Sequence, residues 1–289
     1  MYIFLNDKLV EEAAACVSVF DHGFLYGDGI YETMRSYNGV VFMLDRHIER
    51  LGLSASLIRL APPEEGFLKS AVYETIKSNG LSDAYVRITV SRGKGAIGLD
   101  PGLCSRPTFV VIAKEFVEYP PQYYREGTEV MLAKTQRNLV EALDPRIKSL
   151  NFLNNILAKA EAIDRGAYEA IMLNKDGFIA EGTVSNVFFV RDGRLCTPSP
   201  EAGILEGITR EVVIGAAKAD GINVVEGLFV PEDVFLAEEV FLTNTTGEIV
   251  PVSQLENRTY AVGAMTRHLH DLYRAEVARY LEWAKRVDS

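Results

Sequence analysis

The sequence predicts an α+β protein of two domains, a smaller α/β domain followed by a larger one. In the first part, short apolar strands alternate with segments of helical periodicity, and Asn38-Gly39 signals a tight hairpin. In the second part, short strands follow one another as a meandering sheet or barrel, to which helices are added. Residues 116–128 contain two prolines and several tyrosines, so we expect a linker there, the smaller domain over 1–115 and the larger over 129–289.

The first domain is expected to form a half-buried sheet covered by two helices. Asp45 is placed to cap a helix over residues 47–58, because its carboxylate can accept from the first backbone N–H groups. A second helix over residues 67–79 should end at Gly80, which tolerates the left-handed backbone of a helix terminus. Strands are expected over residues 2–5, 17–20, 29–37, 40–44, 84–93 and 107–116.

The larger domain should combine a helix after a polar loop with the strands of the meander. Leu153, Ile156, Leu157 and Ala160 recur at helical spacing, and Gly166 should end this helix. A further helix is expected from Gly207 to just before Gly221, and an amphipathic helix near the C-terminus. Strands are expected over residues 129–135, 169–173, 178–182, 185–190, 194–198, 223–227 and 239–243.

Composition and charge exclude several classes of function. The net charge of −10, from 40 acidic and 30 basic residues, disfavours nucleic acid as a partner. No apolar run has the length of a membrane span, and the N-terminal MYIFLNDKLV is typical of a strand and not of a signal peptide, so we expect a cytoplasmic protein. The three cysteines lie far apart, and His268 and His270 point to different faces of a helix, so no metal site is expected.

Three kinds of group could act together on one cofactor. Taken singly, Lys148 is typical of a surface lysine, Glu181 of an exposed strand residue, and the turn at 243–247 of an ordinary β-turn. The helix start Gly207–Thr209, however, offers backbone N–H groups and a hydroxyl to a phosphate, and the hydroxyl-rich turn could add further donors. An amine nucleophile, a carboxylate and a phosphate cup are together the set that holds pyridoxal 5'-phosphate.

At these residues the sequence resembles the class IV pyridoxal-phosphate enzymes, also called fold type IV. Seven blocks carry the resemblance in the expected order and cover nearly the whole chain. They are FDHGFLYGDGIYE (20–32), HIERL (47–51), RGKGAIGLDP (92–101), IKSLNFLNN (147–155), AEGTVSNVFFV (180–190), GILEGITR (203–210) and TNTTGEIVPV (243–252).

The resemblance implies roles for individual residues. Lys148 would hold the cofactor and shuttle the proton, and Glu181 would lie beside the pyridine nitrogen and strengthen the ring as an electron sink. The phosphate would be bound by Arg50, Ile208, Thr209 and Thr245. Our candidates for the substrate carboxylate and side chain are Tyr31, Arg35, Arg87 and Thr246, although Arg35 and Arg87 could also be surface charges. A homodimer acting on a small amino acid and a 2-oxo acid is implied.

Within the family, RGKGAIGLDP and the arginine of YETMR look most like branched-chain aminotransferases, which convert L-amino acids with acceptors such as 2-oxoglutarate. Those enzymes usually have FEGIR where this chain has Tyr31–Arg35, GTAAE where it has Asn244–Glu248, and a tyrosine where it has Phe152, which cannot donate a hydrogen bond. Similar departures occur in 4-amino-4-deoxychorismate lyases and D-amino-acid aminotransferases. The latter usually carry a histidine in the loop where this chain has Ala96–Gly98.

The alternative from another class is a non-catalytic protein that binds phosphorylated metabolites or serves as a scaffold. Such a protein should have lost either the lysine or the carboxylate. Because Lys148 and Glu181 are both present, the sequence favours an enzyme.

Overall fold

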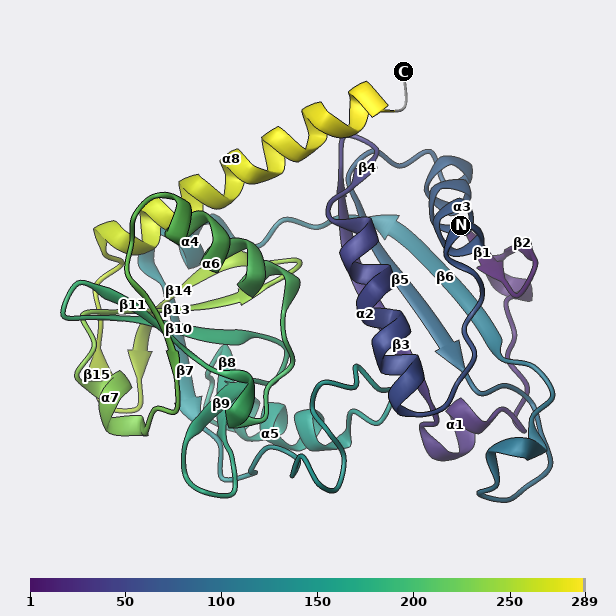
Figure 1. Ribbon diagram of the computed structural model, residues 1–289, viewed down its shortest axis with the longest axis horizontal. Coiled ribbons are helices and arrows are strands. Elements are labelled where there is room, and N and C mark those ends of the chain that lie inside the picture. The colour runs from purple at the N-terminus through teal and green to yellow at the C-terminus, as the bar shows by residue number, and fades with distance from the viewer. Residues whose placement is uncertain (288–289) are drawn as a thin grey trace. The chain divides into compact units, whose positions relative to one another are not determined.

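The computed structural model describes residues 1–287, which form two compact units (Figure 1). The first unit comprises Met1–Val117, Ile147–Phe152 and, at the end of the described chain, residues 280–287. The second comprises Glu118–Arg146 and Leu153–Arg279. After residues 116–128, where the sequence predicts one linker, the chain therefore returns twice to the first unit.

The first unit is built on a six-stranded antiparallel sheet with the order β2-β1-β6-β5-β3-β4. Asn38 and Gly39, with φ of 51° and 83°, form the expected hairpin turn between β3 and β4. The strands are β1 (Tyr2–Leu5), β2 (Lys8–Glu11), β3 (Gly29–Tyr37), β4 (Val40–Val41), β5 (Ala84–Ser91) and β6 (Thr108–Glu115).

Two helices, α2 (Leu44–Leu57) and α3 (Glu65–Ser78), lie against this sheet (Figure 1). Their apolar residues and those of β3, β5 and β6 form a single core, in which Ile30 and Met34 are fully buried. Gly80 follows α3 with φ of 63°, as expected for a glycine at a helix terminus. The other face of β3 is thereby left for the residues predicted to meet the substrate.

Two local predictions for the first unit are wrong. Asp45 does not cap α2, because the helix begins one residue earlier, after Met43, whose φ of 53° is left-handed. Residues 17–20 form no strand, and Val17 and Val19 are 48% and 63% exposed, so the apolar pattern there does not mark buried positions. The chain instead passes into α1 (His22–Tyr26), whose first turn is capped by the Asp21 side chain.

The second unit contains a nine-stranded sheet with the order β12-β11-β10-β13-β14-β7-β8-β9, and β15 pairs with β14. The parallel pairs β7/β14, β7/β8 and β11/β12 interrupt an otherwise antiparallel meander. Strand β9 also contacts β10 and β11, so the sheet curls back on itself. The strands are β7 (Thr128–Leu132), β8 (Glu169–Leu173), β9 (Ile179–Gly182), β10 (Asn186–Arg191), β11 (Arg194–Pro198), β12 (Val224–Gly227), β13 (Glu239–Asn244), β14 (Glu248–Leu255) and β15 (Arg258–Thr259).

Helix α5 (Leu153–Asp164) forms where its periodicity predicts, but its apolar stripe points outward. Leu153, Ile156 and Leu157 are 61%, 57% and 52% exposed, whereas Ala158 and Ala162 are buried. The alanines form a small core with β7 and β8. Small side chains let this helix lie close to the sheet, so the periodicity predicts the helix without predicting which face is covered.

Helix α6 (Ile208–Ala219) contacts β13 and is followed by Gly221, as the sequence predicts. Within residues 1–287, no helix combines the length and the apolar character that a membrane span requires. The remaining helices are α4 (Pro121–Glu126), α7 (Pro231–Phe235) and α8 (Ala264–Val287), with short 3-10 turns η1 (Glu12–Ala14), η2 (Pro101–Leu103) and η3 (Pro200–Ala202).

Candidate active site

Lys148 lies in the segment Ile147–Phe152, which returns to the first unit beside β3. Its backbone N–H donates to Ser54 Oγ at 3.1 Å, and its carbonyl oxygen accepts from the backbone N–H of Tyr31 at 3.0 Å. The Nζ atom lies 4.6 Å from the centre of the Tyr31 ring. The backbone of Lys148 is therefore held on both sides, and its amine lies over an aromatic ring.

The face of β3 away from the helices carries Tyr31 and, two strand positions further each time, Thr33 and Arg35. Arg87 is opposite Thr33 in β5 and so shares this face, and its guanidinium carbon lies 4.0 Å from the centre of the Tyr31 ring. The tyrosine ring thus contacts both Arg87 and Lys148. Burial raises the pKa of Tyr31, so its hydroxyl stays protonated and can donate a hydrogen bond.

Arg35 is 6% exposed, and its guanidinium carbon lies 4.3 Å from the ring centre of Tyr37 and 3.7 Å from that of Phe116. Guanidinium groups stack well on aromatic rings because they are planar and weakly hydrated. The structure therefore places neither Arg35 nor Arg87 among solvated surface charges. Their role toward substrate stays a prediction.

On the opposite face of β3, the inner cluster consists of Glu32, His47 and Arg50. Glu32 is fully buried, and its carboxylate accepts from Arg50 Nε at 2.7 Å, from Arg50 Nη2 at 2.8 Å and from His47 Nδ1 at 2.7 Å. Burial alone would raise the pKa of Glu32, but Arg50 and His47 outweigh it and hold that pKa well below its usual range. Burial lowers the pKa of His47, which is therefore neutral. The cluster fixes the plane of the Arg50 guanidinium, the group predicted to meet the cofactor phosphate.

In the second unit, Glu181 of β9 is 5% exposed and accepts hydrogen bonds from a cation and two amides. Its Oε1 accepts from Arg137 Nε at 2.7 Å, and its Oε2 accepts from the backbone N–H of Leu205 at 2.9 Å and from Asn186 Nδ2 at 3.4 Å. Arg137 in turn donates to Asn154 Oδ1 at 3.3 Å. A buried carboxylate held by a cation and two amides has a fixed direction and a negative charge to offer a protonated ring nitrogen.

The start of α6 has the features of a phosphate site. Gly207 precedes the helix without a side-chain cap, so the first backbone N–H groups, at Ile208 and Thr209, have no acceptor within the helix. A Cβ atom on Gly207 would lie 2.1 Å from Asn186 Oδ1, so only glycine fits. Opposite Asn186 in the sheet, Thr243 Oγ1 is buried and makes no hydrogen bond to any described residue. These donors fit a phosphate dianion.

The turn between β13 and β14 carries the other predicted hydroxyls, Thr245 and Thr246. Asn244 Oδ1 accepts from the backbone N–H groups of Thr246 at 3.1 Å and Gly247 at 2.6 Å, and from Thr246 Oγ1 at 3.1 Å. Tyr119 Oη lies 3.0 Å from Thr246 Oγ1. The turn is therefore internally braced, with Thr246 fixed and Thr245 half-buried at its tip.

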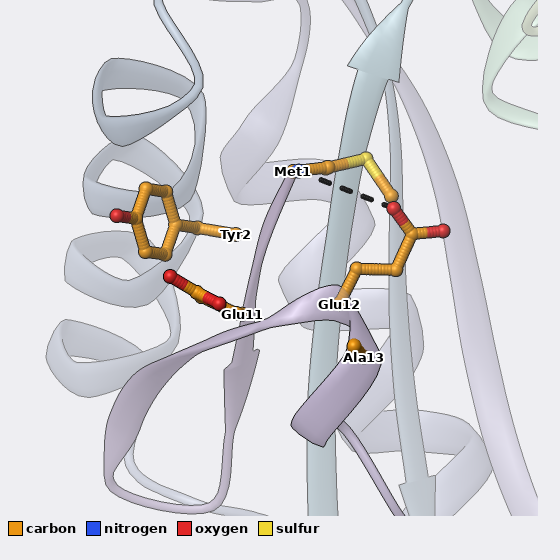
Figure 2. A pocket seen from close by; sticks show the side chains of 5 residues that line it. All are labelled: Met1, Tyr2, Glu11, Glu12 and Ala13. Atoms are coloured by element: carbon orange, nitrogen blue, oxygen red, sulfur yellow. Dashed lines mark ion pairs between the residues drawn. The ribbon is translucent and has the colours of Figure 1, made fainter.

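A surface hollow of about 440 Å³ lies elsewhere, at the N-terminal hairpin (Figure 2). It is lined by Met1, Tyr2, Glu11, Glu12 and Ala13, and the terminal ammonium lies 4.0 Å from Glu12 Oε2. None of these residues is among the predicted site residues. The hollow therefore has no part in the chemistry considered below.

Comparison with known proteins decides the family. A family model described as amino-transferase class IV matches residues 29–255. A protein of Methanocaldococcus jannaschii with the provisional name branched-chain-amino-acid aminotransferase is 45% identical over 278 residues, which cover 95% of this chain and 96% of that protein. The chain belongs to the class IV aminotransferases. This confirms the family of pyridoxal-phosphate enzymes expected from the seven sequence blocks.

Solved structures confirm the predicted α+β fold of this class IV aminotransferase. The branched-chain aminotransferase of Thermoproteus uzoniensis, solved with norvaline, is 36% identical with a TM-score of 0.91, and the match covers 98% of both chains. The T.th. branched-chain aminotransferase complexed with N-(5'-phosphopyridoxyl)-L-glutamate is 31% identical with a TM-score of 0.89, covering 94% of this chain and 92% of that one.

Two further relatives of the class IV aminotransferase bear names of other activities. The aminodeoxychorismate lyase of Bacillus subtilis is 35% identical over 283 residues, covering 95% of this chain and 94% of the relative. A D-alanine aminotransferase of Listeria innocua is 36% identical over 296 residues, covering 99% and 100%. These identities match the 36% of the Thermoproteus uzoniensis enzyme, so identity at this level does not separate the three reactions.

Sequence reasoning missed several residues that hold the predicted site of this class IV aminotransferase. Asn186 and Asn244 lie within recognised blocks, so the blocks could have suggested them. Arg137 and Tyr119 lie outside all seven blocks and contact Glu181 and Thr246 only in the folded chain. No local pattern could have pointed to them.

Proposed function

We propose that this enzyme transfers the amino group of a branched-chain or related L-amino acid to a 2-oxo acid such as 2-oxoglutarate. One observation carries the proposal, namely that the Lys148 amine and the Arg87 guanidinium both lie over the ring of Tyr31. Transamination needs an amine that moves a proton at the α-carbon and a cation that binds the neighbouring carboxylate. The match to a branched-chain enzyme solved with norvaline supports this substrate class.

The cofactor is pyridoxal 5'-phosphate, which supplies an aldehyde for amines and a ring that withdraws electrons from the α-carbon. Lys148 would hold the aldehyde carbon and, once displaced by the substrate amine, would take the α-proton at Nζ and return it to the cofactor carbon. Its backbone, fixed by Ser54 and Tyr31, anchors the side chain whose amine lies over the Tyr31 ring.

Glu181 would keep the ring nitrogen protonated, because Arg137, Leu205 and Asn186 leave its carboxylate negative and fixed. The phosphate would be bound by Ile208, Thr209, Thr245 and Arg50, to which the buried hydroxyl of Thr243 adds a further donor. Each of these groups is a donor or a cation, as a dianion requires.

The substrate would be held by Arg87, Tyr31, Arg35 and Thr246. Arg87 and the protonated Tyr31 hydroxyl suit the α-carboxylate. The rings of Tyr31 and Phe152, 5.5 Å apart, offer an apolar wall for a branched side chain. Arg35, whose guanidinium carbon lies close to two aromatic rings, would favour the second carboxylate of an acceptor such as 2-oxoglutarate.

The experiment that tests the proposal compares three reactions of the purified enzyme. We expect 2-oxo acid formation from L-leucine with 2-oxoglutarate, little from D-alanine with 2-oxoglutarate, and no pyruvate from 4-amino-4-deoxychorismate. The Arg87→Gln variant should lower kcat/KM for leucine by about 10²-fold, since a charge-assisted bond to the carboxylate is lost. Turnover of D-alanine in preference to leucine would contradict the proposal.

The second candidate is 4-amino-4-deoxychorismate lyase, which would release pyruvate and 4-aminobenzoate. It is favoured by the relative in Bacillus subtilis and by Phe152, which cannot donate the hydrogen bond expected of a tyrosine in branched-chain enzymes. Pyruvate from aminodeoxychorismate without an added 2-oxo acid would select this second function.

The homodimer implied by the family resemblance and the cytoplasmic location expected from the sequence stay predictions. Light scattering of the purified protein tests the first, and cell fractionation tests the second.

A further inference from the structure

Glu248 follows the turn that carries Thr245 and Thr246 and has an unusual environment for a glutamate. It is 3% exposed, and its φ of 56° lies in the left-handed region. A left-handed φ is common at the end of a hairpin loop, so the backbone alone requires no outside contact. The buried carboxylate does require hydrogen-bond partners, because burying a charge without them is costly.

Two residues of α8 bind the Glu248 carboxylate. Its Oε2 accepts from His270 Nε2 at 2.8 Å and from Arg274 Nε at 3.0 Å, and these residues are four apart, on one helix face. Burial alone would raise the pKa of Glu248, but His270 and Arg274 lower it to about 2. The carboxylate is thus ionised at neutral pH and stays bound.

Helix α4 holds the same end of the turn through Tyr124. The Tyr124 ring stacks on His270 with centres 5.5 Å apart and an angle of 25°, and its hydroxyl donates to the Gly247 carbonyl at 3.3 Å. Tyr124, Glu248, His270 and Arg274 are called the turn clamp below. It joins two helices to the last residues of the turn.

We propose that the turn clamp positions Thr245, the predicted phosphate donor of this turn, and thereby sets the affinity for the phosphate of the cofactor. The inference rests on the proposed function, because it assigns Thr245 to that phosphate. Asn244 braces the turn at its start, and the clamp fixes its end at Gly247 and Glu248. Donors that are already in place bind an anion without the cost of ordering them. The clamp residues are positioning residues, since they act through the turn.

The test titrates the apoprotein with pyridoxal 5'-phosphate and, separately, with pyridoxal, which lacks the phosphate. In Glu248→Gln and His270→Ala, the Kd for pyridoxal phosphate should rise about tenfold, while that for pyridoxal stays within about twofold of wild type. His268→Ala is the matched control, because His268 lies on the same helix, is 49% exposed and binds Asp220. Its two Kd values should equal those of the wild type.

An equal rise of both Kd values, or no rise for pyridoxal phosphate, would overturn the proposal. A merely structural role would weaken both ligands alike, so the ratio of the two Kd values is the decisive readout. If Glu248→Gln does not fold, Arg274→Gln replaces it, since Arg274 is 59% exposed and the same result is expected. If the wild type binds pyridoxal phosphate no more tightly than pyridoxal and shows no borohydride-sensitive absorbance, the proposed function itself fails. If the wild type shows both properties and only the Kd ratio of the variants is unchanged, the turn clamp proposal alone fails.

Discussion

Both units hold a buried glutamate between a histidine and an arginine of a single helix. In the inner cluster of the first unit, Glu32 binds His47 and Arg50, which are three apart on α2. In the turn clamp of the second unit, Glu248 binds the same two residue types, four apart on α8. Spacings of three and four residues both place two side chains on one helix face, so either pair can converge on one carboxylate.

The two clusters differ in their exposure to water. Arg50 is 11% exposed, whereas Arg274 is 59% exposed. An ion pair shielded from water is costly to break because the remaining partner keeps an uncompensated charge, while an exposed partner can be solvated again. The same residue types therefore form an ion pair shielded from water at Arg50 and an ion pair that water reaches at Arg274.

The largest effect should come from the inner cluster. Glu32→Gln leaves Arg50 buried without its counter-ion and should lower the free energy of unfolding by about 3–5 kcal/mol. Urea denaturation followed by circular dichroism measures it. Glu49→Gln is the control, since Glu49 is on α2, is 60% exposed and should change stability by less than about 0.5 kcal/mol. Equal stability of the two variants would contradict the stabilising role of the inner cluster.

A third buried carboxylate, Glu181, pairs with the equally buried Arg137, so Glu181→Gln should lower stability as Glu32→Gln does and should in addition lower the rate of the reaction. Glu181→Gln should lower kcat by about 10²-fold or more, because a neutral ring nitrogen stabilises the developing negative charge poorly. A primary isotope effect with α-deuterated leucine should rise in this variant. An unchanged kcat would mean that the ring nitrogen faces another residue.

The stabilising contribution of the Glu248 carboxylate in the turn clamp should depend on pH. The folded-state pKa of Glu248, about 2, lies below its ordinary value of 4.5, so its stabilising contribution is present above pH 4.5 and is lost as the pH falls toward 2. Wild type should exceed Glu248→Gln by about 2 kcal/mol at pH 6, and this difference should shrink below pH 4.5. Denaturation curves at several pH values test this, and a difference independent of pH would contradict it.

Salt should produce the smallest effect. Arg274→Gln should cost about 0.5–1 kcal/mol in dilute buffer and less in about 1 M NaCl, because the exposed guanidinium is screened. The loss caused by Arg50→Gln should hardly depend on salt. If both losses shrink equally, exposure does not distinguish the two clusters.

The sequence predicted the family, the helices and most strands because each is encoded by nearby residues. Turn signals such as Asn38-Gly39 and the block IKSLNFLNN depend on positions a few residues apart. Predictions failed where a distant part of the chain decides the outcome. The strand expected over residues 17–20 does not form, because a strand needs a neighbouring strand to pair with. The local alternation of side chains that predicts a strand carries no information about such a neighbour.

The candidate site divides in the same way. Lys148 and Glu181 were named from their blocks, but the partners that orient them come from far along the chain. Ser54 lies 94 residues before Lys148, and Arg137 lies 44 residues before Glu181. Such pairs form only after the sheets and helices have assembled, so their chemistry is absent from any local stretch of sequence.

The most direct test of the lysine assignment is to reduce the enzyme with borohydride in the presence of pyridoxal phosphate, digest it and locate the pyridoxyl group by mass spectrometry. The label should lie on the peptide that contains Lys148, and Lys148→Ala should give no labelled peptide and almost no turnover. A label on any other lysine, or full activity of Lys148→Ala, would contradict the mechanism proposed for this enzyme.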